Sequence, residues 1–341
     1  MRARLRRSAR TAVDRLLARR NYGLVPLAQL SDRYTHDLHD TEVELPTGAA
    51  EELRADHPRL TELRRAYRAL GSPVAGDTRW RGEVLNSWLD LRYFRGDNAY
   101  IWHYRETLQV SRLKYFVFLR YVQGRDTRSL IEQLGEDGLF GCWTYRFPGE
   151  APCSRDLLDS VNELCFLDRR LDLFARRGLR VVDVGAGYGR LAYRFAQALP
   201  DLADYCCLDA VPESTFLSEC YTRFRGVSPP ARTVALPDVG RLTEGAFDLA
   251  VNVHSFSECS LASIEWWAAQ LGRLRVPNLF LVPNEAAGFL STEADGSRRS
   301  YLPAIEAAGY QLAAEEPVFD DPAVRELLDV HDRFCLFELI G

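Results

Sequence analysis

The sequence predicts an α/β protein in which a mainly helical N-terminal domain precedes a seven-stranded, doubly wound sheet. Two observations predict this fold class. After about residue 152, short apolar stretches of strand type alternate with amphipathic stretches of helix type, which is typical of a mostly parallel sheet with helices on both faces. Before that point, apolar residues recur at helical spacing, and no low-complexity linker separates the two parts. The predicted domains are therefore residues 1–152 and 153–341.

Seven strands are expected in the second domain, at residues 179–187, 204–210, 231–238, 247–255, 278–285, 310–319 and 333–341. Helices are expected at 154–178, at 189–199, from Pro212, around 264–271 and at 301–310. Ser154 is a typical N-cap for the first of these helices, and Gly178 is its predicted end. The last two strands lack a full crossover helix of ordinary composition between them, which favours an antiparallel strand near one edge of the sheet.

The N-terminal part is rich in aromatic residues and in helical patterns. Apolar spacing predicts helices within 105–124 and 126–135, which Gly124 and Gly135 end. The first 20 residues contain many arginines and read as a solvated helix rather than as a secretory signal. This domain is expected to pack against the sheet as a cap that helps to bind the substrate.

Composition excludes several classes of partner. The 341 residues carry a formal net charge of −5, which argues against non-specific nucleic-acid binding. No apolar run reaches the roughly 20 residues that span a bilayer, so no membrane partner is expected. The eight cysteines are scattered and lack metal-ligand spacing, which predicts buried thiols in a reducing cytoplasm and no metal site. His36 and His39 also lack metal-ligand spacing and are expected at the surface. The sequence leaves open whether the protein forms a homo-oligomer.

The run "VVDVGAGYGR", Val181–Arg190, is the most informative stretch of the chain. Its glycines, Gly185, Gly187 and Gly189, follow a strand and open a helix, so that backbone N–H groups can approach a ligand closely. The third glycine comes one position earlier than in the G-x-G-x-x-G pattern of dinucleotide-binding enzymes. Asp209 stands at the end of the next strand, where an acid accepts ribose hydroxyls in several classes of adenosine-binding protein.

This spacing resembles motif I of class I S-adenosylmethionine-dependent methyltransferases, and the resemblance implies S-adenosylmethionine as cofactor and methyl donor. Donor contacts are expected from the loop and from neighbouring strand ends, at Asp183, Gly185, Ala186, Gly187, Gly189, Asp209, Ala210, Asp238 and Asn252. Two other interpretations stay open: a nicotinamide-dependent dehydrogenase, and a tight turn in an unrelated α/β protein.

The methyl acceptor is expected beyond the carboxyl ends of the strands, where ligands bind in open α/β sheets. His254 follows the fourth strand and is the predicted general base, because imidazole titrates near neutral pH. Glu258 is the reserve base. Acceptor contacts are predicted from two strand ends and from cap aromatics, at Ser255, Asn284, Glu285, His103, Trp143 and Tyr145. The N/D-P-P-Y/F tetrapeptide typical of amino-methylating DNA enzymes is missing.

Several segments together resemble the bacterial sugar O-methyltransferase family. They are "SRDLLDSVNELCFL", "VVDVGAGYGRLAYRF", "LDAVPESTFLSE", "NVHSFSEC" and "VPNE", with "NAYIWHYRE" and "EDGLFGCWTYRF" on the cap side. The resemblance covers about Asp97 to the C-terminus and implies transfer of a methyl group to a hydroxyl of a sugar or a glycosylated small molecule. A carboxyl or amino acceptor on a natural product, and a scaffold that binds the donor without catalysis, are the alternatives.

Overall fold

The structure is a computed structural model that describes residues 45–76, 80, 89–96, 100, 101, 103 and 108–340. The predicted Arg-rich helix within the first 20 residues, His36 and His39 lie outside the described residues.

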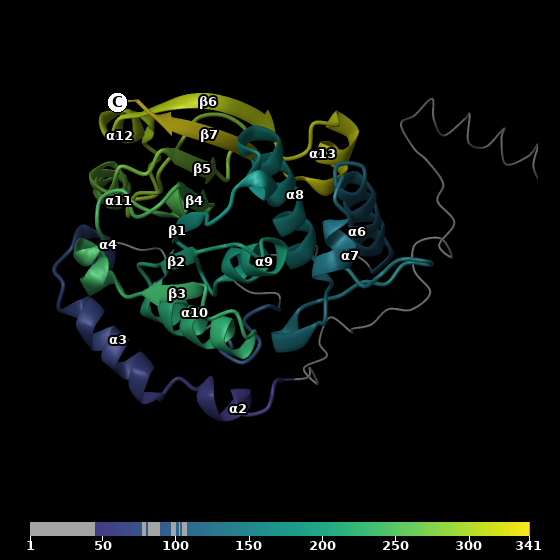
Figure 1. Cartoon of the computed structure of the whole chain (residues 1–341), viewed down its shortest axis with the longest axis horizontal. Helices are drawn as coiled ribbons and strands as arrows, with labels where there is room; N and C mark the ends of the chain where they lie inside the picture. The colour runs from purple at the N-terminus through teal and green to yellow at the C-terminus, as the bar shows by residue number, and fades with distance from the viewer. Residues whose placement is uncertain are drawn as a thin grey trace, which may run out of the picture.

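The described residues form one seven-stranded mixed sheet in the order β3-β2-β1-β4-β5-β7-β6 (Figure 1). The strands are β1 (Arg180–Val184), β2 (Asp204–Leu208), β3 (Ala231–Val234), β4 (Leu249–Val253), β5 (Asn278–Val282), β6 (Tyr310–Pro317) and β7 (Arg333–Leu339). β1 to β5 pair in parallel, whereas β7 lies antiparallel between β5 and β6. The central strands form here because their apolar residues are buried on both faces of the sheet, as parallel strands require. The predicted fold class, with an antiparallel strand near one edge, is confirmed.

The strand order places the loop after β1 beside the loop after β4. β1 pairs with β2 on one side and with β4 on the other, so the direction of winding reverses between β1 and β4. Such a reversal leaves a crevice at the carboxyl ends of the two strands. Because β7 runs antiparallel to β5, with Cys335 opposite Leu281, the start of β7 lies at this same edge.

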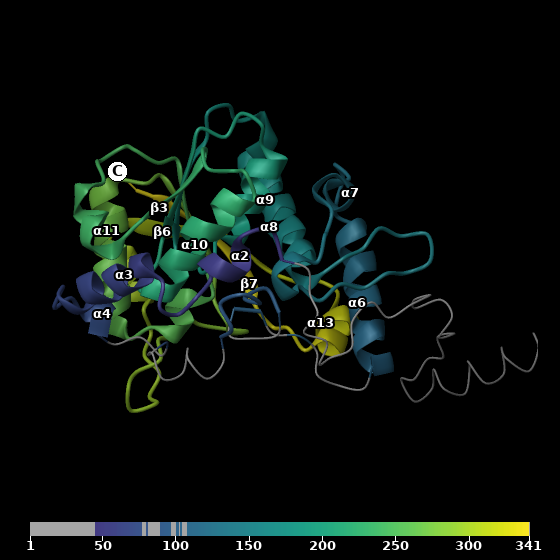
Figure 2. The ribbon, with the colours of Figure 1, turned by 90° about the horizontal axis from the view of Figure 1, so that it is seen from below.

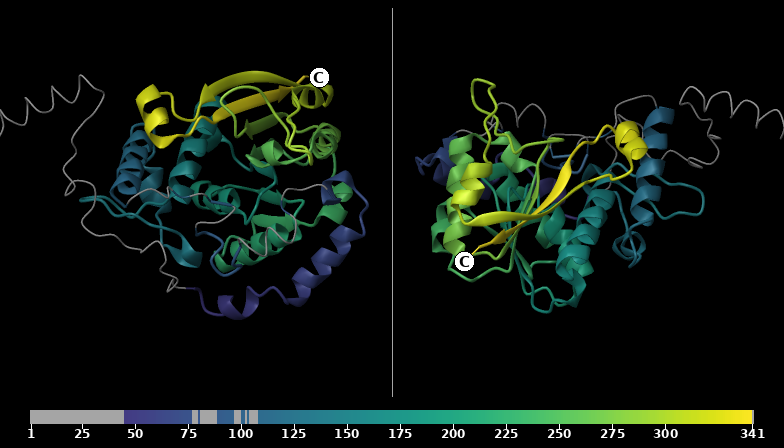
Figure 3. Two further views of the ribbon diagram at one scale, coloured as in Figure 1. Left: turned by 180° about the vertical axis from the view of Figure 1, so that it is seen from behind. Right: turned by 90° about the horizontal axis from the view of Figure 1, so that it is seen from above.

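Helices cover both faces of the sheet (Figures 2 and 3). One face carries α6 (Leu108–Gln123), α7 (Leu130–Leu134), α8 (Arg155–Leu171), α9 (Arg190–Ala198) and α13 (Pro322–Leu328). Helix α10 (Pro212–Phe224) lies on the same face as α9, because its Ser218 bonds Thr233 of β3 at 3.1 Å and its Tyr221 ring packs edge-on against Tyr193 of α9. The other face carries α11 (Leu261–Leu274) and α12 (Leu302–Ala307). After α2 (Ala49–Glu52), α3 (Pro58–Arg68) packs on α10 and α4 (Pro73–Gly76) packs on α11. Among the described residues, no helix combines the length and the apolar character needed to cross a membrane.

Helix α8 begins as predicted and ends early. The Ser154 hydroxyl accepts the N–H of Leu157 at 3.0 Å and caps the first turn. The predicted end at Gly178 is wrong, because Asp172 adopts a left-handed conformation with φ 50° and stops the helix at Leu171. A short 3-10 turn, Leu173–Ala175, then leads toward β1.

The chain before α8 shares both hydrophobic cores with the sheet. The helix α3 lies along α10, where Arg59 pairs with Glu219 at 2.7 Å and Arg64 with Glu213 at 2.8 Å (Figure 1). The Tyr67 hydroxyl, also on α3, lies 2.7 Å from the Thr215 hydroxyl. The N-terminal region is therefore packed firmly against the helices of the sheet, while the domain boundary at residue 152 stays a prediction.

Candidate functional site

The glycine loop after β1 is held in a conformation that only glycine adopts easily. Gly185 and Gly187 have φ of 77° and 58°, in the left-handed region. A Cβ on Gly185 would lie 2.1 Å from Oγ of Ser255, so no side chain fits there. The backbone N–H groups of Gly185 and Ala186 both donate to the Leu208 carbonyl, at 2.8 and 3.1 Å. The loop is thus clamped between the ends of β2 and β4.

Asp209 lies where the sequence predicts the acid that would accept ribose hydroxyls. One carboxylate oxygen accepts the N–H of Gly187 at 2.9 Å, and the other accepts the N–H of Val211 at 2.8 Å. Burial raises the pKa of Asp209 to about 7, even though these N–H groups favour the charged form. The Ser214 hydroxyl and the N–H of Ala210 also donate to this carboxylate. The loop and the acid therefore form one hydrogen-bonded unit.

Asp183 lies inside β1 and is buried in the sheet. It is 4% exposed and accepts the Tyr205 hydroxyl from the neighbouring strand at 2.9 Å. Burial raises its pKa to about 7, against the hydrogen bond from Tyr205. The structure therefore gives Asp183 a partner within the sheet, and its contact with a donor stays a prediction.

Asn252 and Ser255 hold the glycine loop against β4. The amide nitrogen of Asn252 donates to the Val184 carbonyl at 2.8 Å, and its oxygen accepts the N–H of Phe256 at 3.2 Å. The Ser255 hydroxyl lies 2.5 Å from the same amide nitrogen. Both side chains thus shape the loop, and their predicted contacts with donor and acceptor stay predictions.

His254 lies directly after β4 with a positive φ of 66° and a ψ of −31°, which is uncommon for a residue other than glycine. Its Nε2 lies 3.3 Å from an oxygen of Asp332, the residue before β7, and its side chain is 37% exposed. Burial lowers the pKa of His254, but the hydrogen bond and the charge of Asp332 outweigh it and raise the pKa above its usual value. The sequence analysis did not identify Asp332. The sequence does contain a signal for Asp332. A last strand that runs antiparallel must begin at the edge of the sheet where the parallel strands end, so the residue directly before it lies at the reaction edge.

A polar stripe on α8 faces this same region and was also not predicted. Arg190, at the start of α9, binds both oxygens of Glu163 at 2.8 Å, and Arg155 contacts Asp159 at 3.2 Å. The charges of Asp159 and Glu163 add to the rise in the pKa of His254. These side chains are charged yet mostly buried, which is a common property of functional sites.

Two residues of the N-terminal region reach the loop and the end of β4. The ring of Tyr100 lies 3.2 Å from the position that a Cβ on Gly187 would take, and its hydroxyl lies 2.8 Å from the Ser214 hydroxyl. Trp80 stacks near Tyr100, with ring centroids 6.0 Å apart, and its indole N–H donates to Glu258 at 2.7 Å. Glu258, the predicted reserve base, is therefore held by the cap.

The rim after β5 is fastened by internal bonds. The Ser257 hydroxyl donates to Glu285 at 3.0 Å and accepts the N–H of Asn284 at 3.1 Å. Glu285 also pairs with Arg298 from the following loop. The Asn284 side chain is exposed. Glu285 thus fixes this loop, and an acceptor contact by either residue stays a prediction.

The predicted cap aromatics form one stacked group. The rings of His103 and Trp143 lie 4.4 Å apart, and Nδ1 of His103 lies 2.5 Å from the Tyr115 hydroxyl. Tyr145 stacks on Tyr115 at 3.9 Å and is 3% exposed within the hydrophobic core. Trp143 is half-buried, so it is better placed than Tyr145 to meet a substrate.

The remaining predicted donor residues lie near the loop or at the end of β3. Ala186 and Ala210 are half-buried, and Gly189 begins α9 with φ 85°. Asp238 follows β3 and pairs with Arg241 at 2.8 Å on a partly exposed turn. An adenine contact by Asp238 stays a prediction.

A fully buried ionic network holds the glycine loop through Tyr188. Asp156 on α8 binds Arg95 at 3.2 Å and Arg194 at 2.8 Å, and both guanidiniums also bind Glu136. The Tyr188 hydroxyl, within the glycine loop, donates to Asp156 at 2.5 Å. The two arginines hold the pKa of Asp156 far below its usual range despite its burial. This network fixes Tyr188 and so helps to define the loop.

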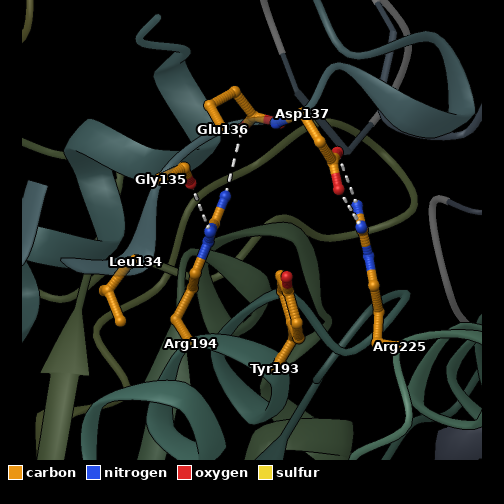
Figure 4. Close-up of a pocket in the computed structure, with 7 residues that line it drawn as sticks. All are labelled: Leu134, Gly135, Glu136, Asp137, Tyr193, Arg194 and Arg225. Atoms are coloured by element: carbon orange, nitrogen blue, oxygen red, sulfur yellow. Dashed lines mark hydrogen bonds and ion pairs between the residues drawn. The ribbon is translucent and has the colours of Figure 1, made fainter. Parts of the chain in front are cut away.

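A cavity of about 220 Å³ adjoins this network (Figure 4). It is lined by Leu134, Gly135, Glu136, Asp137, Tyr193, Arg194 and Arg225. Its charged groups pair with one another, since Arg194 binds Glu136 and Arg225 binds Asp137 (Figure 4). None of the predicted site residues lines it. In the described part of the chain, no three His, Cys, Asp or Glu side chains are grouped so as to hold a metal ion.

No protein-family model and no curated protein sequence matches the chain. Among solved structures, it aligns with the [4+2]-cyclase SpnF at TM-score 0.41 and 16% identity, over 67% of this chain and 97% of that chain. A geranyl diphosphate methyltransferase with sinefungin aligns at TM-score 0.37 and 10% identity, over 53% and 82%. A structure on the conversion of a disulfide bond into a thioacetal group in echinomycin biosynthesis aligns at 0.37 and 17%, over 51% and 80%. The seven-stranded, Rossmann-like mixed sheet is the fold that the resemblance to class I methyltransferases predicts.

Proposed function

We propose that this protein is an S-adenosylmethionine-dependent methyltransferase. The observation that carries the proposal is the unit of glycine loop and acid, in which the N–H of Gly187 donates to Asp209 at the reversal point of the sheet. A carboxylate beside a glycine loop that lets the backbone come close suits the ribose of this donor, which has no pyrophosphate. The residues proposed to hold the donor are Asp183, Gly185, Ala186, Gly187, Gly189, Asp209, Ala210, Asp238 and Asn252.

The proposed acceptor is a hydroxyl of a sugar or a glycosylated small molecule. When bound, the donor supplies a methyl group on a positively charged sulfur. A hydroxyl is a weak nucleophile until its proton is removed, so a base must lie at the mouth of the site. His254 is the proposed base, and Glu258, bound by the indole of Trp80, is the reserve. Ser255, Asn284, Glu285, His103, Trp143 and Tyr145 are the proposed acceptor contacts.

The chain's own contribution is mainly alignment and exclusion of water. Asn252 and Ser255 fix the loop, while Trp80 and Tyr100 cover it from the cap side. Bringing donor and acceptor together in one orientation accounts for a large share of rate enhancement in reactions of this kind. We expect the protein to act in the cytoplasm, in keeping with eight cysteines that are all free thiols.

The proposal is tested by transfer of a labelled methyl group from S-adenosylmethionine to a panel of sugars, glycosides, carboxylic acids and amines. Asp209→Ala is the test variant, and Asp201→Ala, at an exposed aspartate, is its matched control. Label on a hydroxyl with the wild type and Asp201→Ala, and loss with Asp209→Ala, is the expected result. Label on a carboxylate or an amine would establish the alternative acceptors. Donor binding without any transfer would make the protein a scaffold, and binding of NAD in place of the donor would make it a dehydrogenase.

A further inference from the structure

Asp332 and His254 lie far apart in the sequence and meet at the reaction edge. His254 ends β4, and Asp332 precedes β7, the strand inserted antiparallel beside β5. The Asp332 side chain is 18% exposed, so its charge is only partly screened by water. With Nε2 of His254 3.3 Å from the carboxylate, Nε2–H is the natural donor, which leaves Nδ1 as the nitrogen that can accept a proton.

Charged groups from two helices surround this pair. Helix α8 contributes Asp159 and Glu163, and their guanidinium partners are Arg155 and Arg190, the latter from α9. Among the described residues, the cluster therefore contains three carboxylates and two guanidiniums. The charges of these three carboxylates all raise the pKa of His254. Taking up a proton at His254 is thus electrostatically favoured.

We propose that Asp332 is a positioning residue for His254, and that this pair commits the acceptor site to a substrate that must lose a proton, a hydroxyl rather than a carboxylate. The inference rests on the proposed methyl transfer. In that step the bond between the acceptor oxygen and the methyl carbon forms as the methyl–sulfur bond breaks. The hydroxyl proton goes to Nδ1 of His254, and the sulfur leaves as a neutral thioether. A carboxylate acceptor has no proton to give to this base.

The decisive experiment compares Asp332→Asn with Asp329→Asn. Asp329 lies on the same loop and contacts His331 at the same 3.3 Å, but both side chains are exposed, so it is a matched control. The first readout is an NMR titration of the His254 imidazole in the full-length protein without ligands. The pKa of His254 is expected to fall in Asp332→Asn and to stay unchanged in Asp329→Asn. An unchanged pKa in Asp332→Asn overturns the proposal.

The second readout is kinetic. With a hydroxyl acceptor, Asp332→Asn is expected to lower kcat at least tenfold, a smaller loss than the roughly 10²–10⁴ expected for loss of the general base itself, while donor Kd and acceptor KM stay unchanged. The pH midpoint of kcat/KM should move down together with the NMR pKa. A loss confined to KM, or an unshifted pH profile, overturns the positioning role. Efficient methylation of carboxylates overturns the acceptor assignment, whereas a wild type that binds no donor overturns the proposed function and leaves the titration result standing.

Discussion

Replacing Gly185 by alanine tests the tight contact at the centre of the glycine loop. The new Cβ would lie 2.1 Å from Oγ and 2.4 Å from Cβ of Ser255, at a φ of 77°. The left-handed backbone alone costs an alanine about 1–2 kcal/mol. Moving Ser255 also breaks its contact with the buried amide of Asn252, which costs about 1–3 kcal/mol more. The free energy of unfolding should therefore fall by roughly 2–5 kcal/mol.

Gly178 provides the matched control. Its φ is 66°, but a Cβ there would meet nothing within 4 Å, so Gly178→Ala should lose only the backbone part, about 1–2 kcal/mol. Urea denaturation gives both free energies of unfolding, and calorimetry gives the donor affinity. Adding Ser255→Gly to Gly185→Ala should cost little further stability, because the contact of Ser255 with Asn252 is already lost in Gly185→Ala. Equal losses for Gly185→Ala and Gly178→Ala, or losses of Gly185→Ala and Ser255→Gly that simply add in the double variant, would refute the proposed contact between the loop and Ser255.

Three further predictions concern the base, the ionic network and a buried acid. His254→Ala should lower turnover by about 10²–10⁴ with donor affinity within about twofold, and unchanged turnover in a methyl-transfer assay would remove His254 from the mechanism. Asp156→Asn leaves two buried arginines short of a partner and should cost about 3–5 kcal/mol in urea denaturation. Asp56→Asn, in an exposed pair, should cost under about 1 kcal/mol, and a similar loss in both would contradict the network's role. Because the folded chain keeps Asp183 protonated up to about pH 7 and the unfolded chain only to about 4, this group makes stability fall as pH rises between those values. Asp183→Asn should therefore stabilise the protein at pH 8 and lose that advantage at pH 5, and a pH-independent difference between the variant and the wild type would count against a raised pKa.

The sheet could be predicted from the sequence because its strands are short apolar runs punctuated by helices with clear caps. The run "VVDVG" and the N-cap at Ser154 are local signals, and the structure confirms both. The end of α8 could not be found in this way. Asp172 stops the helix by adopting a left-handed conformation, although Gly178 further along is the residue type that usually does so.

Site residues that directly follow a strand could be predicted from the sequence. Site residues that are brought in by the pairing of distant strands could not. Asp209 and His254 follow strands, so the sequence placed them at one edge. Asp332 joins them only because β7 inserts antiparallel between β5 and β6, which is a tertiary choice. Buried charges on α8, such as Glu163, look like ordinary polar positions until the packing of α9 against that helix is known.

The chain also uses some predicted residues for stability. Tyr145 is buried against Tyr115, and Glu285 is bound to Ser257. An aromatic or acidic residue near a strand end gives the same signal whether it faces a substrate or packs inside the protein. Only burial and hydrogen-bond partners separate the two roles.

The most direct test of the donor site is isothermal titration of the full-length wild type and Asp209→Ala with S-adenosylmethionine, with NAD as a competing ligand. The wild type is expected to bind one donor per chain, NAD is expected not to compete, and Asp209→Ala is expected to bind at least tenfold more weakly, since a hydrogen bond to a charged group contributes about 1.5–3 kcal/mol. No heat with the wild type, or equal affinity in Asp209→Ala, would contradict a donor held by the glycine loop and this acid.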